Sequence, residues 1–396
     1  MDFDETGTLL VTSSDDETLR LYSTETATSR KVLFSKKYGI DLVRFTHSPE
    51  AVICASKNNW DGLFQVFPAL FFTHRPSHTR AHTETIRYLS LYDNSYLRYF
   101  RGHRDRVLSL SVSPAADTFV SASLDATVRL WDLRQSACQG VVHMPRTAPA
   151  ARGTPWALAA FDPTGSVFAV AAPHAAPGTA EVKLFDAAQY ERGPFSAAAV
   201  PGVPEAVSLQ FSPDGQRLLL LTAGHRLLLL DTKPGSEKPL AVLVCVFGSL
   251  PLVFALFTSS PTHFGLTLFL PFPSHCSPIA SPPFPCTLYP AHAPRTFHPP
   301  PFPKQHTFED FVNDFARVVE PCFTPDSRFV LCGSEDGTVH VWSAETGAPL
   351  CQWRGQAGPV GIVRFNPRFL MAATSCTNLA FWIPAPAAAP APGDQP

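Results

Sequence analysis

A repeated pattern is the feature that most constrains this chain of 396 residues. An aromatic or aliphatic residue, followed closely by proline, recurs ahead of an apolar run, a small polar turn and an alternating stretch. The pairs are Val112/Pro114, Phe161/Pro163, Phe211/Pro213, Phe323/Pro325 and Phe365/Pro367, with a slightly stretched version at Phe45/Pro49. Successive prolines within the uninterrupted parts lie 49, 50 and 42 residues apart. A period of this length indicates an array of repeated supersecondary units.

The residues inside each unit predict a small antiparallel sheet. In the stretch 120–132, apolar residues such as Val128 and Leu130 alternate with polar ones, as in a strand. An Asp-Ala or Asp-Gly pair between two such runs is typical of a tight hairpin. A four-stranded sheet cannot bury its own faces, but sheets stacked radially bury both faces and leave only short edges. The sequence therefore predicts an all-β fold, a seven-bladed β-propeller.

Two segments interrupt the repeats, at 60–83 and 241–304. The second is rich in Pro and Phe, and no Asp, Glu, Lys or Arg occurs from Pro239 to Pro294. Leu240–Phe257 is apolar enough to suggest a membrane helix, but a gene-model error explains both inserts more simply, with a genuine disordered insert as the alternative, and we expect no membrane association. We expect a single propeller over 1–384, with blades within 1–59, 84–240 and 305–384, followed by a Pro/Ala tail at 385–396.

Charge and cysteine usage exclude several function classes. The net charge of −2 and the pI of about 6.7 give no global basic field, so we expect no direct sequence-specific nucleic-acid binding. The nine cysteines contain no C-x-x-C pair and the first residues do not resemble a signal peptide, which favours a reducing compartment. Gly-rich phosphate loops, H-E-x-x-H and G-x-S-x-G are absent from the sequence, so we expect no enzyme, cofactor or metal site.

The segment 102–134 carries the clearest repeat, GHRDRVLSLSVSPAADTFVSASLDATVRLWDLR. With GH at its start and WD near its end, it closely resembles the WD40 repeat. The resemblance assigns to the buried polar network of that family His103, Ser121, Asp125 and Trp131. Equivalent positions recur at Thr12 and Asp16 and at Asp336 and Trp342, with Cys332 in the place of the serine. Because a motif repeated in several blades is architectural, a catalytic Ser–His–Asp set is the less favoured alternative.

Longer stretches are similar to one family of WD-repeat proteins. They are LFSKKYGIDLVRFTHSPEAVICASKN (33–58), TIRYLSLYDNSYLRYFRGH (85–103), SLDATVRLWDLRQSACQG (123–140) and FNPRFLMAATSCTNLAFWIP (365–384). They resemble the WD-repeat subunits of COMPASS (Set1-type) histone H3 lysine-4 methyltransferase complexes. The resemblance implies a non-enzymatic nuclear scaffold that links the methyltransferase to RNA polymerase II with phosphorylated C-terminal repeats. The same family also serves phosphatase and mRNA 3′-end-processing complexes.

Two groups of residues are candidates for partner binding. Phosphopeptide capture requires Arg or Lys, and the local basic clusters are Lys36, Lys37, Arg98, Arg101, Arg104 and Arg106. The segment 119–134 also resembles the box by which WD proteins engage the adaptor of a cullin-RING ubiquitin ligase. In that alternative the chain is a substrate receptor, and the adaptor contacts are Asp132 and Arg134.

The amino end departs from the family pattern. Members of the family have a further strand before the position of Met1, and a propeller usually closes by lending its first strand to the last blade. We therefore expect Met1 to be an internal methionine and ring closure to be incomplete at the N-terminus, with unpaired edge groups on the last blade.

Overall fold

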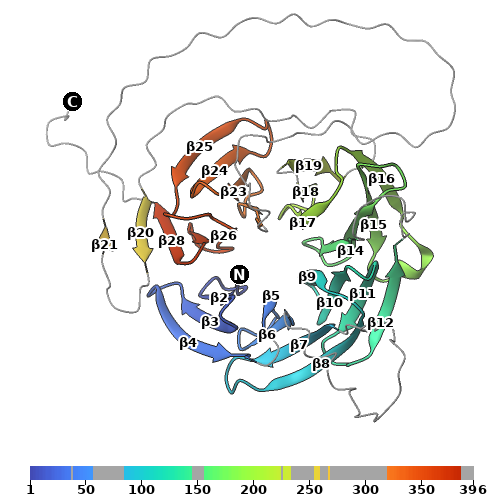
Figure 1. Ribbon diagram of the computed structural model, residues 1–396, viewed down its shortest axis with the longest axis horizontal. Coiled ribbons are helices and arrows are strands. Elements are labelled where there is room, and N and C mark those ends of the chain that lie inside the picture. Colours follow the sequence, from blue (N-terminus) through green and yellow to red (C-terminus); the bar gives the residue numbers. More distant parts are fainter. Residues whose placement is uncertain are drawn as a thin grey trace, which may run out of the picture.

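The computed structural model describes residues 1–36, 39–56, 84–144, 156–223, 226–232, 254–258, 266–267 and 319–384. These residues form seven antiparallel sheets, arranged as blades in a ring (Figure 1). The prediction of an all-β, seven-bladed propeller is confirmed. In the described part of the chain the one helical element is a single 3-10 turn, η2 (Tyr190–Arg192), and no helix there is long and apolar enough to cross a membrane.

The first four blades have four strands each, numbered from the centre of the ring outward. Their bounds are β1 (Asp2–Phe3), β2 (Leu9–Ser13), β3 (Thr18–Ser23) and β4 (Thr28–Phe34) in blade 1, and β5 (Asp41–Phe45), β6 (Ala51–Ala55), β7 (Glu84–Ser90) and β8 (Tyr96–His103) in blade 2. They are β9 (Val107–Val112), β10 (Thr118–Ser123), β11 (Thr127–Asp132) and β12 (Cys138–His143) in blade 3. In blade 4 they are β13 (Leu158–Phe161), β14 (Val167–Pro173), β15 (Thr179–Asp186) and β16 (Ser196–Pro201). The turn η2, between β15 and β16, contacts β12 of blade 3.

The last three blades are less regular. Blade 5 has three described strands, β17 (Ala206–Phe211), β18 (Arg217–Thr222) and β19 (Leu227–Asp231). Blade 6 has β22 (Cys322–Phe323), β23 (Phe329–Gly333), β24 (Thr338–Ser343) and β25 (Pro349–Arg354). Blade 7 has β26 (Ile362–Phe365), β27 (Ala372–Ser375) and β28 (Leu379–Pro384), extended outward by β20 (Phe254–Thr258) and β21 (Leu266–Thr267).

Ring closure differs from the expectation in one respect. As expected, the N-terminus lends no strand to blade 7, because β1 pairs with β2 inside blade 1. The edge of β28 is not left unpaired, however: β20 runs antiparallel to it, with Phe254 opposite Pro384 and Thr258 opposite Ala380. An exposed strand edge accepts any extended segment that can reach its free N–H and C=O groups. Here that segment comes from the region expected to be an insert.

The hydrophobic core lies between neighbouring blades. Leu184 on β15 and Leu220 on β18, from blades 4 and 5, belong to the same buried cluster. Because each blade is covered on both faces, its middle strands are nearly continuous apolar runs, as in RLLLLT of β18. The neighbouring blades thus bury the apolar faces that a single sheet would leave exposed to solvent.

One hairpin turn recurs because its residues fit it. In blades 1, 3 and 6 an Asp precedes a residue with positive φ: Glu17 (63°), Ala126 (61°) and Gly337 (84°). Each Asp carboxylate accepts hydrogen bonds from the backbone N–H and hydroxyl of a threonine two positions on, for example from Thr127 at 2.9 and 2.6 Å. This side-chain turn holds the hairpin and fixes the register of the two strands.

Several predicted segments fall outside the described residues. They are 60–83, most of 241–304, the tail 385–396 and Lys37.

Candidate functional site

Blade 3 contains a buried chain of hydrogen bonds. Ser121 Oγ lies 2.7 Å from His103 Nε2 and 2.8 Å from Trp131 Nε1, and His103 Nδ1 lies 3.1 Å from Asp125 Oδ2. Because the carboxylate only accepts, Nδ1 donates to it, and the Ser121 hydroxyl donates to Nε2 while accepting from the indole. The structure thus brings together the four residues that the sequence singled out. His103 is the last residue of β8 in blade 2, so these hydrogen bonds also connect blade 2 to blade 3.

The pKa shifts of His103 and Asp125 agree with a structural role for this network. Burial lowers the pKa of His103, although the hydrogen bond to Asp125 works in the opposite direction. Burial raises the pKa of Asp125, but hydrogen bonds from His103, Thr127 and the Arg104 backbone outweigh it, so the net shift is downward. His103 is therefore neutral at pH 7, and its contact with Asp125 is a hydrogen bond between a neutral ring and a carboxylate. Since Ser121 is 0% and His103 1% exposed, a substrate has no access to this pair.

The equivalent positions in other blades are arranged differently. In blade 1, Asp16 bonds to Thr18 and forms an ion pair with Arg20 at 2.9 Å, while Thr12 lies opposite Arg20 in the β2–β3 register. In blade 6, Asp336 bonds to Thr338 at 2.9 Å, which in turn contacts His340 Nε2 at 2.9 Å.

The aromatic and sulfur groups of blade 6 replace the serine-centred arrangement. His340 stacks on Trp342 with ring centroids 5.6 Å apart. Cys332 lies opposite His340 in the register, and its Sγ contacts the Gly333 carbonyl oxygen at 3.4 Å. In blade 3, by contrast, one serine hydroxyl contacts both the histidine and the tryptophan.

Blade 7 has a related network that sequence reasoning missed. Thr374 Oγ1 accepts from Trp382 Nε1 at 2.9 Å and from Gln356 Nε2 at 3.0 Å. The hydroxyl and the tryptophan are 8 residues apart here and 10 apart in blade 3. The motif of blade 3 did not identify this network, because the hairpin of blade 7 is shorter and Gln356 stands in the place of histidine. A Thr followed eight residues later by a Trp is the sequence signal that could have identified it.

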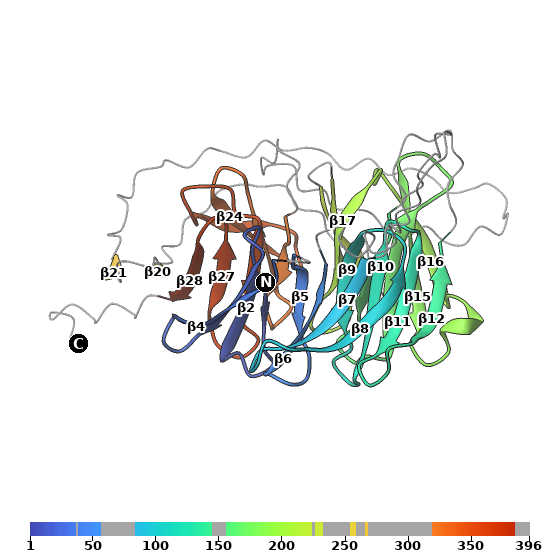
Figure 2. The ribbon, with the colours of Figure 1, turned by 60° about the horizontal axis from the view of Figure 1, so that its bottom comes forward.

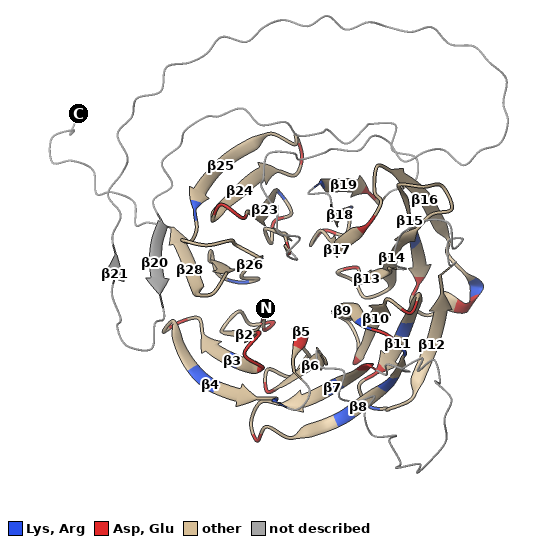
Figure 3. Cartoon of the chain, viewed as in Figure 1, with Lys and Arg blue, Asp and Glu red and all other residues tan. Residues whose placement is uncertain are grey.

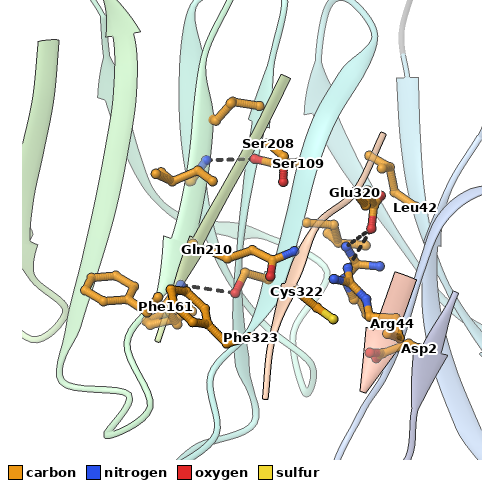
Figure 4. Close-up of a pocket in the computed structure, with 18 of the residues that line it drawn as sticks. Asp2, Leu42, Arg44, Ser109, Phe161, Ser208, Gln210, Glu320, Cys322 and Phe323 are labelled. Carbon is orange, nitrogen blue, oxygen red and sulfur yellow. Dashed lines mark hydrogen bonds and ion pairs between the residues drawn. The ribbon is translucent and has the colours of Figure 1, made fainter. Parts of the chain in front are cut away.

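A cavity of about 350 Å³ lies at the centre of the ring, lined by the innermost strands (Figure 4). Its serine hydroxyls serve the fold: Ser109 and Ser111 on β9 accept the backbone N–H groups of Ala159 and Phe161 on β13. Burial raises the pKa of the Cys322 thiol to about 12, so this group stays protonated at neutral pH. The cavity thus holds no activated nucleophile among the described residues that line it.

One wall of the cavity carries a charged cluster between distant parts of the chain. Glu320 lies 3.5 Å from Arg44 Nη2 and 2.6 Å from Arg364 Nη2 (Figure 4). Burial raises the pKa of Glu320, but the two arginines outweigh it and lower the pKa to about 2. Arg364 also donates to the Met1 and Pro321 carbonyl oxygens. The cluster joins blades 2, 6 and 7 to the first residue.

The basic candidates separate into two surfaces. Arg104 and Arg106 lie in the turn between β8 and β9 and are exposed, with Asp105 between them; we call them the rim arginines. Arg106 Nη2 forms an ion pair with Asp41 at 3.0 Å, and the Arg104 N–H donates to Asp125. Arg98 and Arg101 lie on the outer strand β8, and Lys36 follows the outer strand β4.

The residues proposed to contact a ubiquitin-ligase adaptor lie together at the end of β11. Arg134 Nε and Nη2 donate to the two Asp132 oxygens at 3.0 and 2.9 Å. The Arg134 side chain is 72% exposed, whereas Asp132 is nearly buried. The pair therefore presents a guanidinium whose orientation is already fixed by its own chain.

Comparison with known proteins places the chain in a family. The family model "WD domain, G-beta repeat" matches residues 1–23, 94–132 and 302–343. The chain is 35% identical over its whole length to "Protein ANTHESIS POMOTING FACTOR 1" of Arabidopsis thaliana, covering 89% of that protein. It is 33% identical over 97% of its length to "WD repeat-containing protein 82" of Drosophila melanogaster, covering 89% of that protein.

The fungal relatives agree with the resemblance seen in the sequence. "Set1 complex component swd2" of Schizosaccharomyces pombe is 31% identical over 96% of this chain, which covers 91% of that protein. "COMPASS component SWD2" of Saccharomyces cerevisiae is 31% identical over 60% of this chain. The chain therefore belongs to the WD-repeat family that includes the Set1 complex component swd2 and WD repeat-containing protein 82.

Proposed function

We propose that this chain is a non-enzymatic WD40 scaffold subunit of a COMPASS-like histone H3 lysine-4 methyltransferase complex in the nucleus. The similarity to Set1 complex component swd2, which extends over 96% of the chain, carries this proposal. The site geometry agrees with it, because Ser121 and His103 of blade 3 are buried and their hydrogen bonds connect blades 2 and 3. A rigid ring with several separate outer surfaces suits a subunit that joins other proteins.

The test is purification of the tagged full-length chain from nuclear extract, followed by mass spectrometry. The expected result is co-purification of a Set1-type methyltransferase and its other subunits. A partner set without any methyltransferase subunit would contradict the proposal. A variant with the Glu320 cluster disrupted serves as a folding control, since it weakens the ring without altering an outer surface.

The second part of the proposal is a link to RNA polymerase II with phosphorylated C-terminal repeats. Support comes from the exposed rim arginines, since guanidinium groups bind phosphate through strong charge-assisted hydrogen bonds. Arg106 already pairs with Asp41, so a phosphate must compete with that carboxylate. We therefore expect Arg104→Ala/Arg106→Ala to weaken binding of a phosphoserine repeat peptide, and Asp41→Asn to strengthen it.

Fluorescence anisotropy with the phosphorylated and unphosphorylated peptides measures this. Arg192→Ala/Arg354→Ala, which removes two arginines elsewhere, is the matched control and should bind as the wild type does. Equal affinity of the wild type and the rim variant would remove the rim arginines from the phosphopeptide site.

The alternative assembly is a cullin-RING ubiquitin ligase, with this chain as substrate receptor. The observation that favours it is the exposed, pre-oriented Arg134 on Asp132. Arg134→Ala should abolish co-purification of the ligase adaptor and leave methyltransferase subunits unaffected. Phosphatase or mRNA 3′-end-processing subunits in the same purification would instead support membership of those complexes. Adaptor binding that survives Arg134→Ala would argue against this site.

A further inference from the structure

The fourth strand of blade 7 has an unusual origin. In blades 1, 2, 3, 4 and 6 the outermost strand follows the third strand of the same blade directly, as β4 follows β3. In blade 7 the fourth position is taken by β20, which in the chain lies between β19 of blade 5 and β22 of blade 6 (Figure 1). Within the described sheets β20 pairs with β28 and β21. Its departure would therefore break no strand pair of blades 5 and 6 that the structure describes.

The backbone of β28 alternates between its two neighbours. The Cys376 N–H donates to the Asn378 carbonyl oxygen at the hairpin between β27 and β28. Hydrogen-bonded pairs alternate along an antiparallel ladder, so in the register of these strands Ala380 and Trp382 bond to β27. The residues between them direct their N–H and C=O groups to the outer edge of the sheet.

Three residues therefore form the outer edge of β28, namely Leu379, Phe381 and Ile383. β20 lies along this edge with Phe257 opposite Phe381 and Ala255 opposite Ile383. An extended segment that adds to a sheet edge in this way gains its affinity from the main chain and its specificity from the side chains on either side. The edge of β28 is thus a site for a strand, and its neighbours decide which strand fits.

Blade 1 supplies an apolar wall beside this edge. Tyr22 on β3 belongs to the buried cluster between blades 1 and 7, so its face of blade 1 is directed at blade 7. Thr18 and Arg20 share that face, and they lie opposite Phe34 and Val32 on β4. Val32 is 41% and Phe34 59% exposed. Figures 1 and 2 show blades 7 and 1 as neighbours, and β4 is itself a fourth strand, so these two side chains flank the fourth position of blade 7.

Blade 6 supplies a second apolar wall. Ala380 and Trp382 of β28 belong to the buried cluster between blades 6 and 7. Trp353 on β25 packs against the same cluster, and its ring centre lies 5.8 Å from that of Trp382. Because side chains alternate along a strand, Cys351 shares the face of Trp353. A strand added to β28 therefore meets apolar side chains on both of its faces.

Little charge faces this position. β28 itself carries no Lys, Arg, Asp or Glu (Figure 3). On the wall from blade 1, Arg20 forms an ion pair with Asp16 at 2.9 Å. Arg30 donates to Ser23 Oγ, and Lys36 lies beyond the end of β4. Burying a charge without a matched counter-charge is costly, so the walls favour an uncharged apolar segment, and β20, with the sequence FALFT, is one.

We propose that the fourth position of blade 7 is a strand-exchange site, where an extended apolar segment of a partner protein displaces β20 and pairs with the outer edge of β28. β20 then acts as an autoinhibitory strand, because it covers the edge until the partner segment binds. The two apolar walls select the partner segment, and the backbone groups of β28 hold it. This proposal does not depend on the methyltransferase assembly or on the rim arginines, which concern other surfaces.

The first experiment measures backbone hydrogen exchange of the full-length chain with and without a synthetic peptide that carries FALFT between Gly-Ser flanks. β20 is tethered in the same chain and competes at an effective concentration on the order of 1 mM, so the peptide is added in the millimolar range. We expect the amides of Ala255 and Phe257 to exchange faster when the peptide is added, while those of Phe381 and Ile383 stay protected. Unchanged exchange of the two β20 amides throughout this range would overturn the proposal.

The second experiment releases β20 by mutation. Ala255→Pro/Phe257→Pro, the β20 variant, removes the two N–H groups that β20 directs at β28, so the edge becomes free. In fluorescence anisotropy this variant should bind the labelled peptide at least tenfold more tightly than the wild type, because the tethered competitor is gone. Adding Ile383→Pro should abolish that binding, whereas Ile383→Ala, which keeps the N–H group, should not. Equal affinity of the wild type and the β20 variant would contradict strand exchange.

The apolar walls are tested in the β20 variant. Val32→Ser/Phe34→Ser should weaken peptide binding roughly tenfold, as loss of a central aromatic anchor does. The matched control Leu97→Ser/Phe195→Ser removes two apolar residues of 51% and 60% exposure elsewhere and should leave binding unchanged. Urea unfolding of each variant accompanies the binding data and should show one cooperative transition.

The peptide itself supplies the last control. A peptide with Glu at the two positions that pair with Phe381 and Ile383 should bind at least tenfold more weakly than the FALFT peptide. Equal binding of the two peptides, or binding that leaves exchange at Phe381 and Ile383 of the β20 variant unprotected, would overturn the proposal. The β20 variant should still co-purify with methyltransferase subunits and bind the phosphopeptide, so failure here is distinguishable from failure of the proposed function.

Discussion

Replacing Ser121 by alanine tests the network of blade 3 most directly. The hydroxyl serves two buried partners, accepting from Trp131 Nε1 at 2.8 Å and donating to His103 Nε2 at 2.7 Å. Alanine leaves both ring nitrogens without that partner, and Trp131 and His103 are 0% and 1% exposed, so water cannot replace it. Each buried polar group left unsatisfied costs about 1–3 kcal/mol. We therefore expect Ser121→Ala to lower the free energy of unfolding by roughly 2–5 kcal/mol.

Urea unfolding followed by circular dichroism measures this loss, with Ser136→Ala, an exposed serine of the same blade, as the matched control. A domain typically has about 5–15 kcal/mol of stability in total, so the shift in midpoint should be large. Hydrogen exchange of the Trp131 indole should also become faster. A loss below about 0.5 kcal/mol, the usual range for surface substitutions, would refute the view that this network stabilises the ring.

Three further variants test other parts of the fold. Burial raises the pKa of Glu84 to about 7 from its usual 4.5. Its contribution to the free energy of unfolding is therefore present below pH 4.5 and is lost as the pH rises to 7. In urea unfolding, Glu84→Gln should be as stable as the wild type at pH 4.5 and more stable than it at pH 8, by at most about 3 kcal/mol. Ala126→Gly should stabilise the hairpin by about 1 kcal/mol, because Ala126 has a φ of 61° that glycine adopts without strain; no gain in thermal midpoint would contradict this. Glu320→Gln should cost roughly 3–5 kcal/mol, because it leaves Arg44 and Arg364 buried without their counter-charge; an unchanged midpoint would show that the cluster contributes little.

The repeat unit predicted the blades because its turns and strands depend on residues that are close together in the sequence. The Asp–Ala pair at 125–126 sets a turn, the alternation around Val128 sets strands, and sheets with two apolar faces must stack. The blade 3 network was predictable for the same reason, since its serine, aspartate and tryptophan lie within one blade at a recurring spacing. The Thr374 network of blade 7 was missed because its hairpin is shorter and Gln356 replaces histidine.

Contacts between residues far apart in the chain were beyond sequence reasoning. Four of the six basic candidates lie within 98–106, yet the structure divides these four between the rim turn and the outer strand β8. The Glu320 cluster depends on three blades meeting at the central cavity, and no local pattern marks it.

The sequence by itself determined the fold class, the number of repeats and the family, because periodicity and turn residues act over a few positions. Only the tertiary structure decided which surfaces exist. Pairing of β20 with β28, and the Glu320 cluster between blades 2, 6 and 7, follow from how the ring brings distant segments together. Such contacts depend on the closed arrangement of seven sheets, which no single repeat encodes.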